Sequence, residues 1–151
     1  MSQDFYLGNP NLKKVGTEIQ FTKDQIQEYL RCKEDPVYFA MTYIKIISLD
    51  EGIVPFKMWD FQQELIESFH ENRFNIAKLP RQTGKSTTCV SYLLHYILFN
   101  DNVNVGILAN KLSTARDLLG RLQLAYEQLP MWLQQGIVVY NKGSMELENG
   151  S

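Results

Sequence analysis

Residues 74–99 constrain the fold more than any other part of this chain. A short apolar run over 76–79 leads into a turn over 80–84, and a helical pattern follows from Lys85 to about Phe99. The apolar run predicts a strand. The wide apolar arc of the next segment predicts a helix that packs on a sheet and is covered by neighbouring elements.

The next two segments continue this alternation. Val103 to Ala109 form an apolar run typical of a strand that is buried on both faces. Apolar residues then recur at helical spacing from Leu118 to Leu129, and Pro130 ends the pattern. An order of strand, helix, strand and helix predicts an α/β fold with a parallel-rich sheet flanked by helices.

The turn between the first strand and its helix reads PRQTGKST from Pro80 to Thr87, which closely matches the second half of the GxxxxGK[ST] phosphate-binding pattern. Backbone N–H groups of such a loop converge on phosphate oxygens, and the helix N-terminus adds its positive dipole. Leu79 replaces the first glycine and Pro80 lacks an N–H, so the early loop has fewer donors. An ordinary Gly-Lys-Ser at a helix start is the alternative, but the flanking strands favour a phosphate site.

The loop residues have distinct expected roles with ATP and Mg²⁺. Lys85 is expected to bridge the β- and γ-phosphates, Ser86 to place its hydroxyl on the magnesium ion, and Thr87 to bond a phosphate nearer the base. Gly84 permits close approach of the phosphates. The predicted nucleotide-binding residues are Gln62, Gln82, Thr83, Gly84, Lys85, Ser86 and Thr87.

Two side chains extend this site. Gln62 shares a helical face with Leu65, Ile66 and Phe69, and its amide can both accept from and donate to adenine, which would select ATP over GTP. A glutamine bonded to nearby backbone fits the spacing equally well. Arg81 lies inside the loop, where a guanidinium can reach the γ-phosphate during cleavage. Pairing of Arg81 with a carboxylate is its alternative.

Shorter signals indicate elements before the loop. Thr22 with Gln25 predicts a capping box at the start of a helix. Asp35 followed by Pro36 predicts the N-cap and first residue of a second helix. A turn-like stretch over 50–55 follows, and a helix is predicted over 59–72. We therefore divide the chain into a helical lead-in, 1–55, and a nucleotide-binding half, 56–151.

Alternating residues near the end of the chain predict a hairpin. Ile137 to Tyr140 form one strand, and Met145 and Leu147 point inward on the next. Asn149 with Gly150 is typical of a second hairpin turn, which requires a further strand after it to pair with the strand before it. The sequence therefore predicts a C-terminal hairpin that is truncated, and a chain that is a fragment.

The remaining charged and aromatic residues have ordinary expected roles. Lys111, Arg116 and Arg121 are expected to be solvated charges on or beside the last helix. Trp59 and Trp132 are expected to fill the core.

Composition excludes several classes of protein. The 151 residues are 44% hydrophobic, which suits one compact core, and the net charge of −2 gives no overall electrostatic footprint for nucleic acid. Cys32, Cys89, His70 and His95 lack the spacing of a zinc site or a disulfide scaffold, and a reducing cytoplasm fits. The polar start MSQDFYLGNP and the short apolar stretch 89–99 predict neither export nor membrane insertion.

Across nearly its whole length the chain resembles the large terminase subunits of tailed bacteriophages, most closely the T4-like branch. The matching motifs are YLGNP near the start, DPVYFA at 35–40, DFQ at 60–62, PRQTGKST at 80–87, VGILANK ending at Lys111, and LP followed by GIVVYNKGSMELENGS at the end.

This resemblance implies an additional-strand P-loop NTPase that hydrolyses ATP to move double-stranded DNA into a procapsid. It implies a homo-oligomeric ring at the capsid portal in the host cytoplasm, with a small terminase subunit as partner. Gln62 would contact adenine, Arg81 the γ-phosphate, Lys85 the phosphates and Ser86 the magnesium, so that Arg81 and Lys85 are the expected catalytic residues. The family's acidic catalytic pair, coupling motif and nuclease have no counterpart in the 151 residues, which predicts little hydrolysis by this chain alone.

Two other readings stay open. A superfamily 2 helicase fragment shares a glutamine before the phosphate loop and a strand with a lysine after it. A docking module that binds nucleotide without turnover would also lack the acidic pair.

Overall fold

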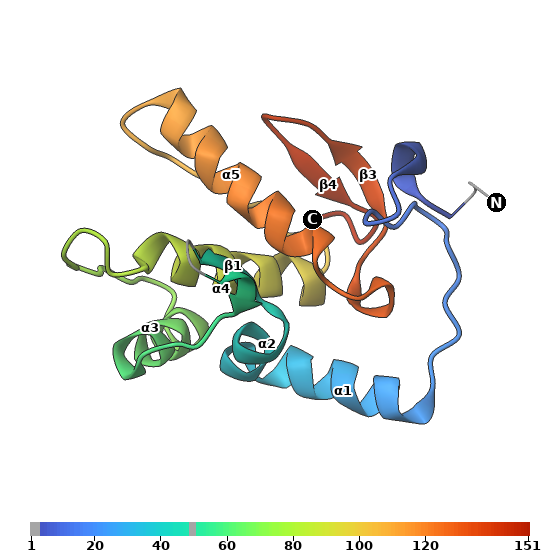
Figure 1. The fold of residues 1–151 in the computed structure, drawn as a ribbon, viewed down its shortest axis with the longest axis horizontal. Helices are drawn as coiled ribbons and strands as arrows, with labels where there is room; N and C mark the ends of the chain where they lie inside the picture. Colours follow the sequence, from blue (N-terminus) through green and yellow to red (C-terminus); the bar gives the residue numbers. More distant parts are fainter. Residues whose placement is uncertain (1–3, 49–50) are drawn as a thin grey trace.

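The computed structural model describes residues 4–48 and 51–151 as a helical assembly with two small sheets (Figure 1). The helices are α1 (Lys23–Glu34), α2 (Pro36–Tyr43), α3 (Asp60–Glu71), α4 (Lys85–Phe99) and α5 (Leu112–Glu127), with 3-10 turns η1 (Tyr6–Gly8) and η2 (Met131–Leu133). The strands form two antiparallel pairs, β1 (Lys45–Ser48) with β2 (Gly52–Pro55) and β3 (Ile137–Tyr140) with β4 (Met145–Leu147).

Helix α4 lies at the centre of the molecule, in contact with α2, α3 and α5 (Figure 1). Leu94 and Leu98 on this helix are buried, as the wide apolar arc in the sequence predicts. One hydrophobic cluster joins them to side chains as distant in sequence as Leu12 and Leu147. The core therefore includes residues from both predicted parts of the chain, and the division at residue 55 stays a prediction.

The predicted capping signals are confirmed at α1 and α2. The Thr22 hydroxyl accepts a hydrogen bond from the Gln25 N–H at 3.2 Å, and the Gln25 side-chain oxygen accepts from the Thr22 N–H at 3.0 Å. The Asp35 carboxylate accepts from the Tyr38 N–H at 2.8 Å, with Pro36 as the first residue of α2. These contacts satisfy N–H groups that have no partner within the helix.

Later elements match their predicted positions. Helices α3 and α4 lie where the helical spacing predicts them. Helix α5 begins at Leu112, six residues before Leu118, the first residue of the predicted apolar pattern. The hairpin of β3 and β4 is confirmed, with Leu147 buried. At the next turn Gly150 has a φ of +81° and its N–H donates to the Leu147 carbonyl.

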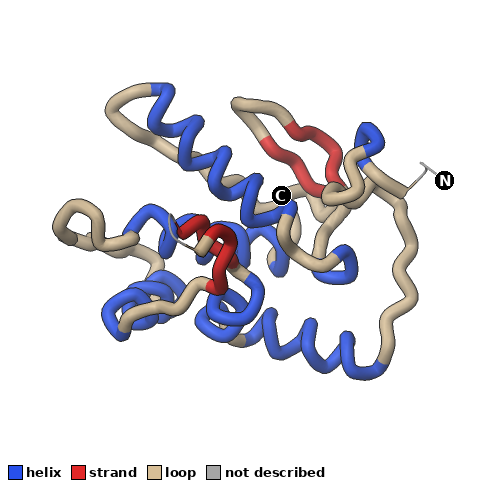
Figure 2. The backbone as a smooth tube through the Cα atoms, viewed as in Figure 1, coloured by secondary structure: helices blue, strands red, loops and turns tan. Residues whose placement is uncertain are grey.

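The predicted parallel-rich sheet is wrong. Residues 74–80 and 103–109 are loops (Figure 2), and both sheets are two-stranded and antiparallel within the described residues. Ile76 is 100% exposed and Leu108 is 91% exposed. The P-loop NTPase fold is therefore not supported. An apolar run predicts what a side chain prefers, but a strand also needs a neighbour that takes its backbone hydrogen bonds, and none lies beside these segments in the described structure.

The turn-like stretch predicted over 50–55 is also different. Asp50 lies outside the described residues, and Gly52 to Pro55 form strand β2. Ile53 pairs with Ile47 and Val54 with Ile46. The β-branched residues of this segment therefore join a hairpin, which propensity allows once a partner strand is present.

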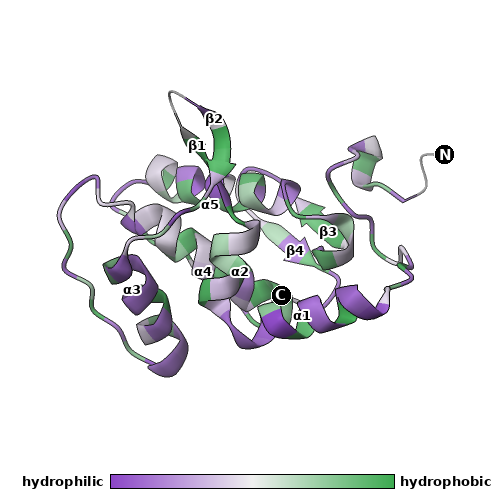
Figure 3. Cartoon of the chain, turned by 60° about the horizontal axis from the view of Figure 1, so that its bottom comes forward, coloured by the Kyte–Doolittle hydropathy of each residue, from purple (hydrophilic) through white to green (hydrophobic). Residues whose placement is uncertain are grey.

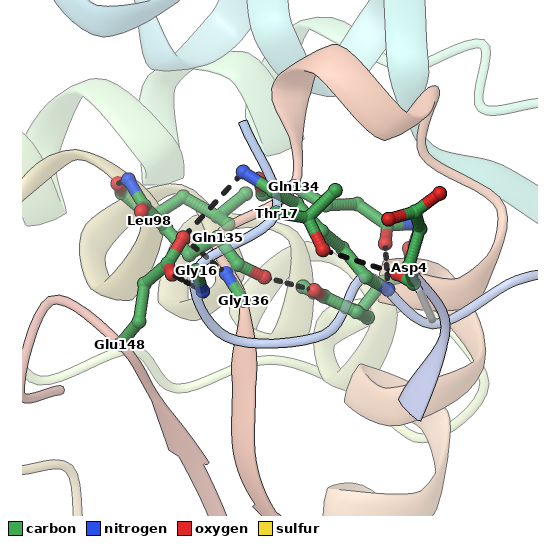
Figure 4. Close-up of polar contacts among 10 residues, drawn as sticks. Asp4, Gly16, Thr17, Leu98, Gln134, Gln135, Gly136 and Glu148 are labelled. Carbon is green, nitrogen blue, oxygen red and sulfur yellow. Dashed lines mark hydrogen bonds and ion pairs between the residues drawn. The ribbon is translucent and has the colours of Figure 1, made fainter. Parts of the chain in front are cut away.

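Segments from the two ends of the chain lie together. The Glu148 carboxylate accepts hydrogen bonds from the N–H of Gly136 at 2.7 Å and of Gly16 at 3.1 Å (Figure 4). Lys13 forms an ion pair with the same carboxylate at 3.5 Å. Glu148 thus fixes residues near the N-terminus against the β3–β4 hairpin.

Most of α1 and α3 is hydrophilic in Figure 3, although α1 also exposes Ile26 and Leu30, and other apolar residues gather between the elements. Within 4–48 and 51–151 no helix combines the length and apolarity needed to cross a bilayer.

Candidate functional site

The N-terminus of α4 carries unpaired backbone donors. Gly84 is the N-cap, with a left-handed φ of +73°, and no side chain caps the helix. The N–H groups of Gly84, Lys85, Ser86 and Thr87 make no hydrogen bond with any described residue, and the first turn contains no acid. Free N–H groups at the positive end of a helix dipole form an environment for an anion.

The side chains of the loop that precedes α4 have few partners. The Thr83 hydroxyl and the Lys85 amino group both donate to the Pro80 carbonyl, at 3.1 and 3.2 Å. Arg81 is exposed, and neither it nor the Ser86 hydroxyl has a hydrogen-bond or ionic partner among residues 4–48 and 51–151. Arg81 and the Ser86 hydroxyl are therefore available to a ligand, whereas Thr83 and Lys85 would first have to release the Pro80 carbonyl.

Gln62 connects α3 to this loop. Its side-chain oxygen accepts from the Trp59 N–H at 3.0 Å, and its Nε2 donates to the Thr83 carbonyl at 3.1 Å. Only 5% of the residue is exposed. Both ends of the amide have backbone partners, so contact with adenine would require exchange of these bonds, and the adenine role stays a prediction.

A pocket of about 610 Å³ opens beside the loop and is within the size range of small-molecule sites. Its walls come from β1, from the segment between β2 and α3 with the start of α3, from α4 with its preceding loop, and from α5. Five of the predicted site residues line it: Gln62, Gln82, Thr83, Gly84 and Thr87. Arg81, Lys85 and Ser86 do not, so the pocket extends from the side of the loop that faces Gln62 and Thr87.

The pocket lining combines positive charge with apolar surface. Lys45, Lys57 and Arg121 supply three cationic side chains, and no acidic residue is part of the lining. Ile46 and Phe56 are among the apolar lining residues. A ligand that combines negative charge with apolar surface matches this lining.

Trp59 differs from its expected role, and Arg121 has a position that its expected role did not include. Trp59 was expected in the core, but it is 64% exposed and lies at the pocket. Arg121 is exposed, as expected of a solvated charge, and it also lines the pocket with Leu124 and Ala125. Helical spacing places these three side chains on one face of α5. The sequence contains that spacing, but only the packing of α5 shows that the face borders the loop.

Magnesium has few protein ligands near this site. Among the described residues no three His, Cys, Asp or Glu side chains gather into a group that could hold a metal ion. Mg²⁺ is commonly bound by substrate phosphates, waters and one or two protein oxygens. The Ser86 hydroxyl, in the first turn of α4, fits such a role.

Other titratable groups have the properties of core residues. Burial raises the pKa of Cys32 to about 12, and Cys32 and Cys89 are both free. Burial lowers the pKa of His95 to about 4, and its Nε2 lies 2.9 Å from the Cys32 carbonyl oxygen. Cys32 and His95 are buried, Cys89 is half-buried, and none of the three lines the pocket.

A scan against models of known protein families found no match to this chain. The candidate site is therefore defined by the geometry of the loop and pocket, and by the motifs in the sequence.

Proposed function

We propose that this chain binds ATP with its phosphates at the N-terminus of α4. The observation that carries the proposal is the set of four unpaired N–H groups, from Gly84 to Thr87, beside a cationic pocket of about 610 Å³. Phosphate oxygens would accept from these donors without displacing any existing bond. The nucleoside would occupy the adjoining pocket.

The side chains of the loop have proposed roles in this complex. Lys85 would exchange the Pro80 carbonyl for oxygens of the β- and γ-phosphates, which are stronger acceptors because they are charged. Arg81, exposed at the loop, would contact the γ-phosphate. Ser86 would bind Mg²⁺, and Thr87 would contact a phosphate nearer the nucleoside. Gln82 and Thr83 line the pocket and would contact the nucleotide there.

The motifs that resemble large terminase subunits suggest the wider role. We propose that the chain is the ATP-binding portion of a viral packaging ATPase, which translocates double-stranded DNA into a procapsid. Its partners would be the capsid portal, the small terminase subunit and further copies in a ring, in the host cytoplasm.

A nucleotide-binding module without turnover is the second candidate. No acidic residue lines the pocket or lies in the first turn of α4, and cleavage of ATP requires a group that positions the attacking water. Because the described site contains no such group, we expect this chain to bind ATP and to hydrolyse very little of it unaided.

Thermal unfolding with magnesium and a slowly hydrolysed ATP analogue tests the proposal. Ligand at about 100 times its dissociation constant adds roughly 2.7 kcal/mol of stability, a rise in melting temperature of about 5–10 °C for a chain of this size. Lys85→Ala should abolish the rise, whereas Lys111→Ala, outside the pocket lining, should keep it. An unchanged melting temperature of the unmutated chain would refute nucleotide binding here.

A further inference from the structure

Arg121 lies at the pocket without a partner of its own. It projects from α5, and with Leu124 and Ala125 it forms the wall that faces Gly84 and Thr87. Its guanidinium makes no ion pair or hydrogen bond with any residue in the described part of the chain. The side chain is therefore free to bind a ligand in the pocket.

The surroundings of Arg121 favour an anion. Lys45 and Lys57 are the other charged residues of the lining, so three cations from three separate elements border one cavity. No carboxylate of the lining neutralises them. Opposite charges attract, so an anionic ligand in this pocket would be stabilised by these side chains.

We propose that Arg121 binds the phosphate chain of the nucleotide from the α5 side of the pocket; this assignment rests on the proposed ATP site. Arginine suits the role better than either lysine, because its planar fork donates two parallel hydrogen bonds to phosphate oxygens. The phosphates would then lie between the N–H groups of α4 and the guanidinium of α5. Bound nucleotide would thus connect the loop to α5 directly.

Titration calorimetry of the full chain with the magnesium complex of a slowly hydrolysed ATP analogue tests this role. Arg121→Gln should weaken binding by about tenfold, the effect of losing one charge-assisted contact. Arg116→Gln is the matched control, because Arg116 lies on the same helix outside this pocket. Arg121→Lys keeps the positive charge but loses the planar guanidinium, so its affinity should lie between those of Arg121→Gln and Arg116→Gln.

The salt dependence of affinity distinguishes charge contact from a structural effect. If Arg121 contacts phosphate, Arg121→Gln should reduce the slope of affinity against NaCl concentration, because one screened interaction is lost. Weaker binding with an unchanged slope, or affinity equal to that of the unmutated chain, would overturn the role of Arg121. If the unmutated chain itself does not bind the analogue, the ATP site fails instead. Arg121→Ala, which also removes the charge, gives the same comparison should Arg121→Gln not fold.

Discussion

Gln62 donates a hydrogen bond from its side-chain amide to the carbonyl of Thr83 at 3.1 Å, and so couples the start of α3 to the loop before α4. The same amide accepts from the Trp59 N–H. Two segments that meet only in the folded chain are therefore held by one buried side chain. We therefore expect the conformation of the loop before α4 to depend on this contact as well as on its own sequence.

Gln62→Ala should lower the free energy of unfolding by about 1–3 kcal/mol, because it leaves the Trp59 N–H and the Thr83 carbonyl without their partner. Urea denaturation measures the effect. Gln63→Ala is the control, since the Gln63 side chain has no hydrogen-bond partner in the described residues and should change stability little. Equal stability of the two variants would contradict the structural role of Gln62.

The same variant distinguishes two roles of Gln62 in binding. Because its amide is bonded to Trp59 and Thr83, we expect Gln62→Ala to weaken ATP and GTP binding by the same factor, through the loop. Competition assays with both nucleotides check this ratio. A loss confined to ATP would instead show that the amide reads adenine.

Gly84→Ala should destabilise the chain and weaken nucleotide binding. The residue has a φ of +73°, which costs about 1–2 kcal/mol for a side chain, and an added Cβ would lie 2.6 Å from Gln62 Nε2. Gly120→Ala, in α5 with no atom near the added Cβ, should instead stabilise by about 0.4–1 kcal/mol. Denaturation midpoints of the two variants should therefore move in opposite directions.

Glu148 should make stability sensitive to acid. Burial raises the pKa of its carboxyl, but N–H donors from Gly136 and Gly16 and the charge of Lys13 outweigh burial, so the pKa lies below its usual value. Because the pKa of Glu148 is lower in the folded chain, its contacts contribute their full stabilisation at pH values above its pKa in the unfolded chain, near 4.5. This stabilisation is lost as the pH falls through the pKa of Glu148 in the folded chain. In urea denaturation at a series of pH values, Glu148→Gln should reduce the fall in the free energy of unfolding below pH 4.5. Glu146→Gln, on the exposed side of β4, should leave it in place.

His95 predicts a second pH dependence, at higher pH. Burial lowers its pKa to about 4, against 6.5 for an ordinary histidine. Between these values the unfolded chain takes up a proton that the folded chain does not, so stability should decline by up to about 1.4 kcal/mol per unit as pH falls from 6.5 toward 4. His95→Gln should remove this slope and His70→Gln, at an exposed residue, should keep it. A slope unchanged in His95→Gln would contradict the assignment.

Elements with a local cause were predictable from the sequence. Thr22 with Gln25, and Asp35 with Pro36, mark helix starts because each cap bonds a backbone group only a few residues away. The apolar arc of α4 and the alternation of β3 and β4 likewise act over short separations. Gly84 lies at the N-cap of α4 without a side-chain cap, in a left-handed conformation that glycine favours.

Features that depend on distant partners were not predictable in this way. The runs 76–79 and 103–109 have the composition of buried strands, yet no described strand bonds to them and they are loops. Arg121 is an exposed charge, as its sequence context predicts, but only the packing of α5 on α4 places it in the lining of the pocket. Local patterns specify helices, caps and turns through bonds between near neighbours, whereas sheet pairing and the grouping of charges in a site arise only when separate segments meet.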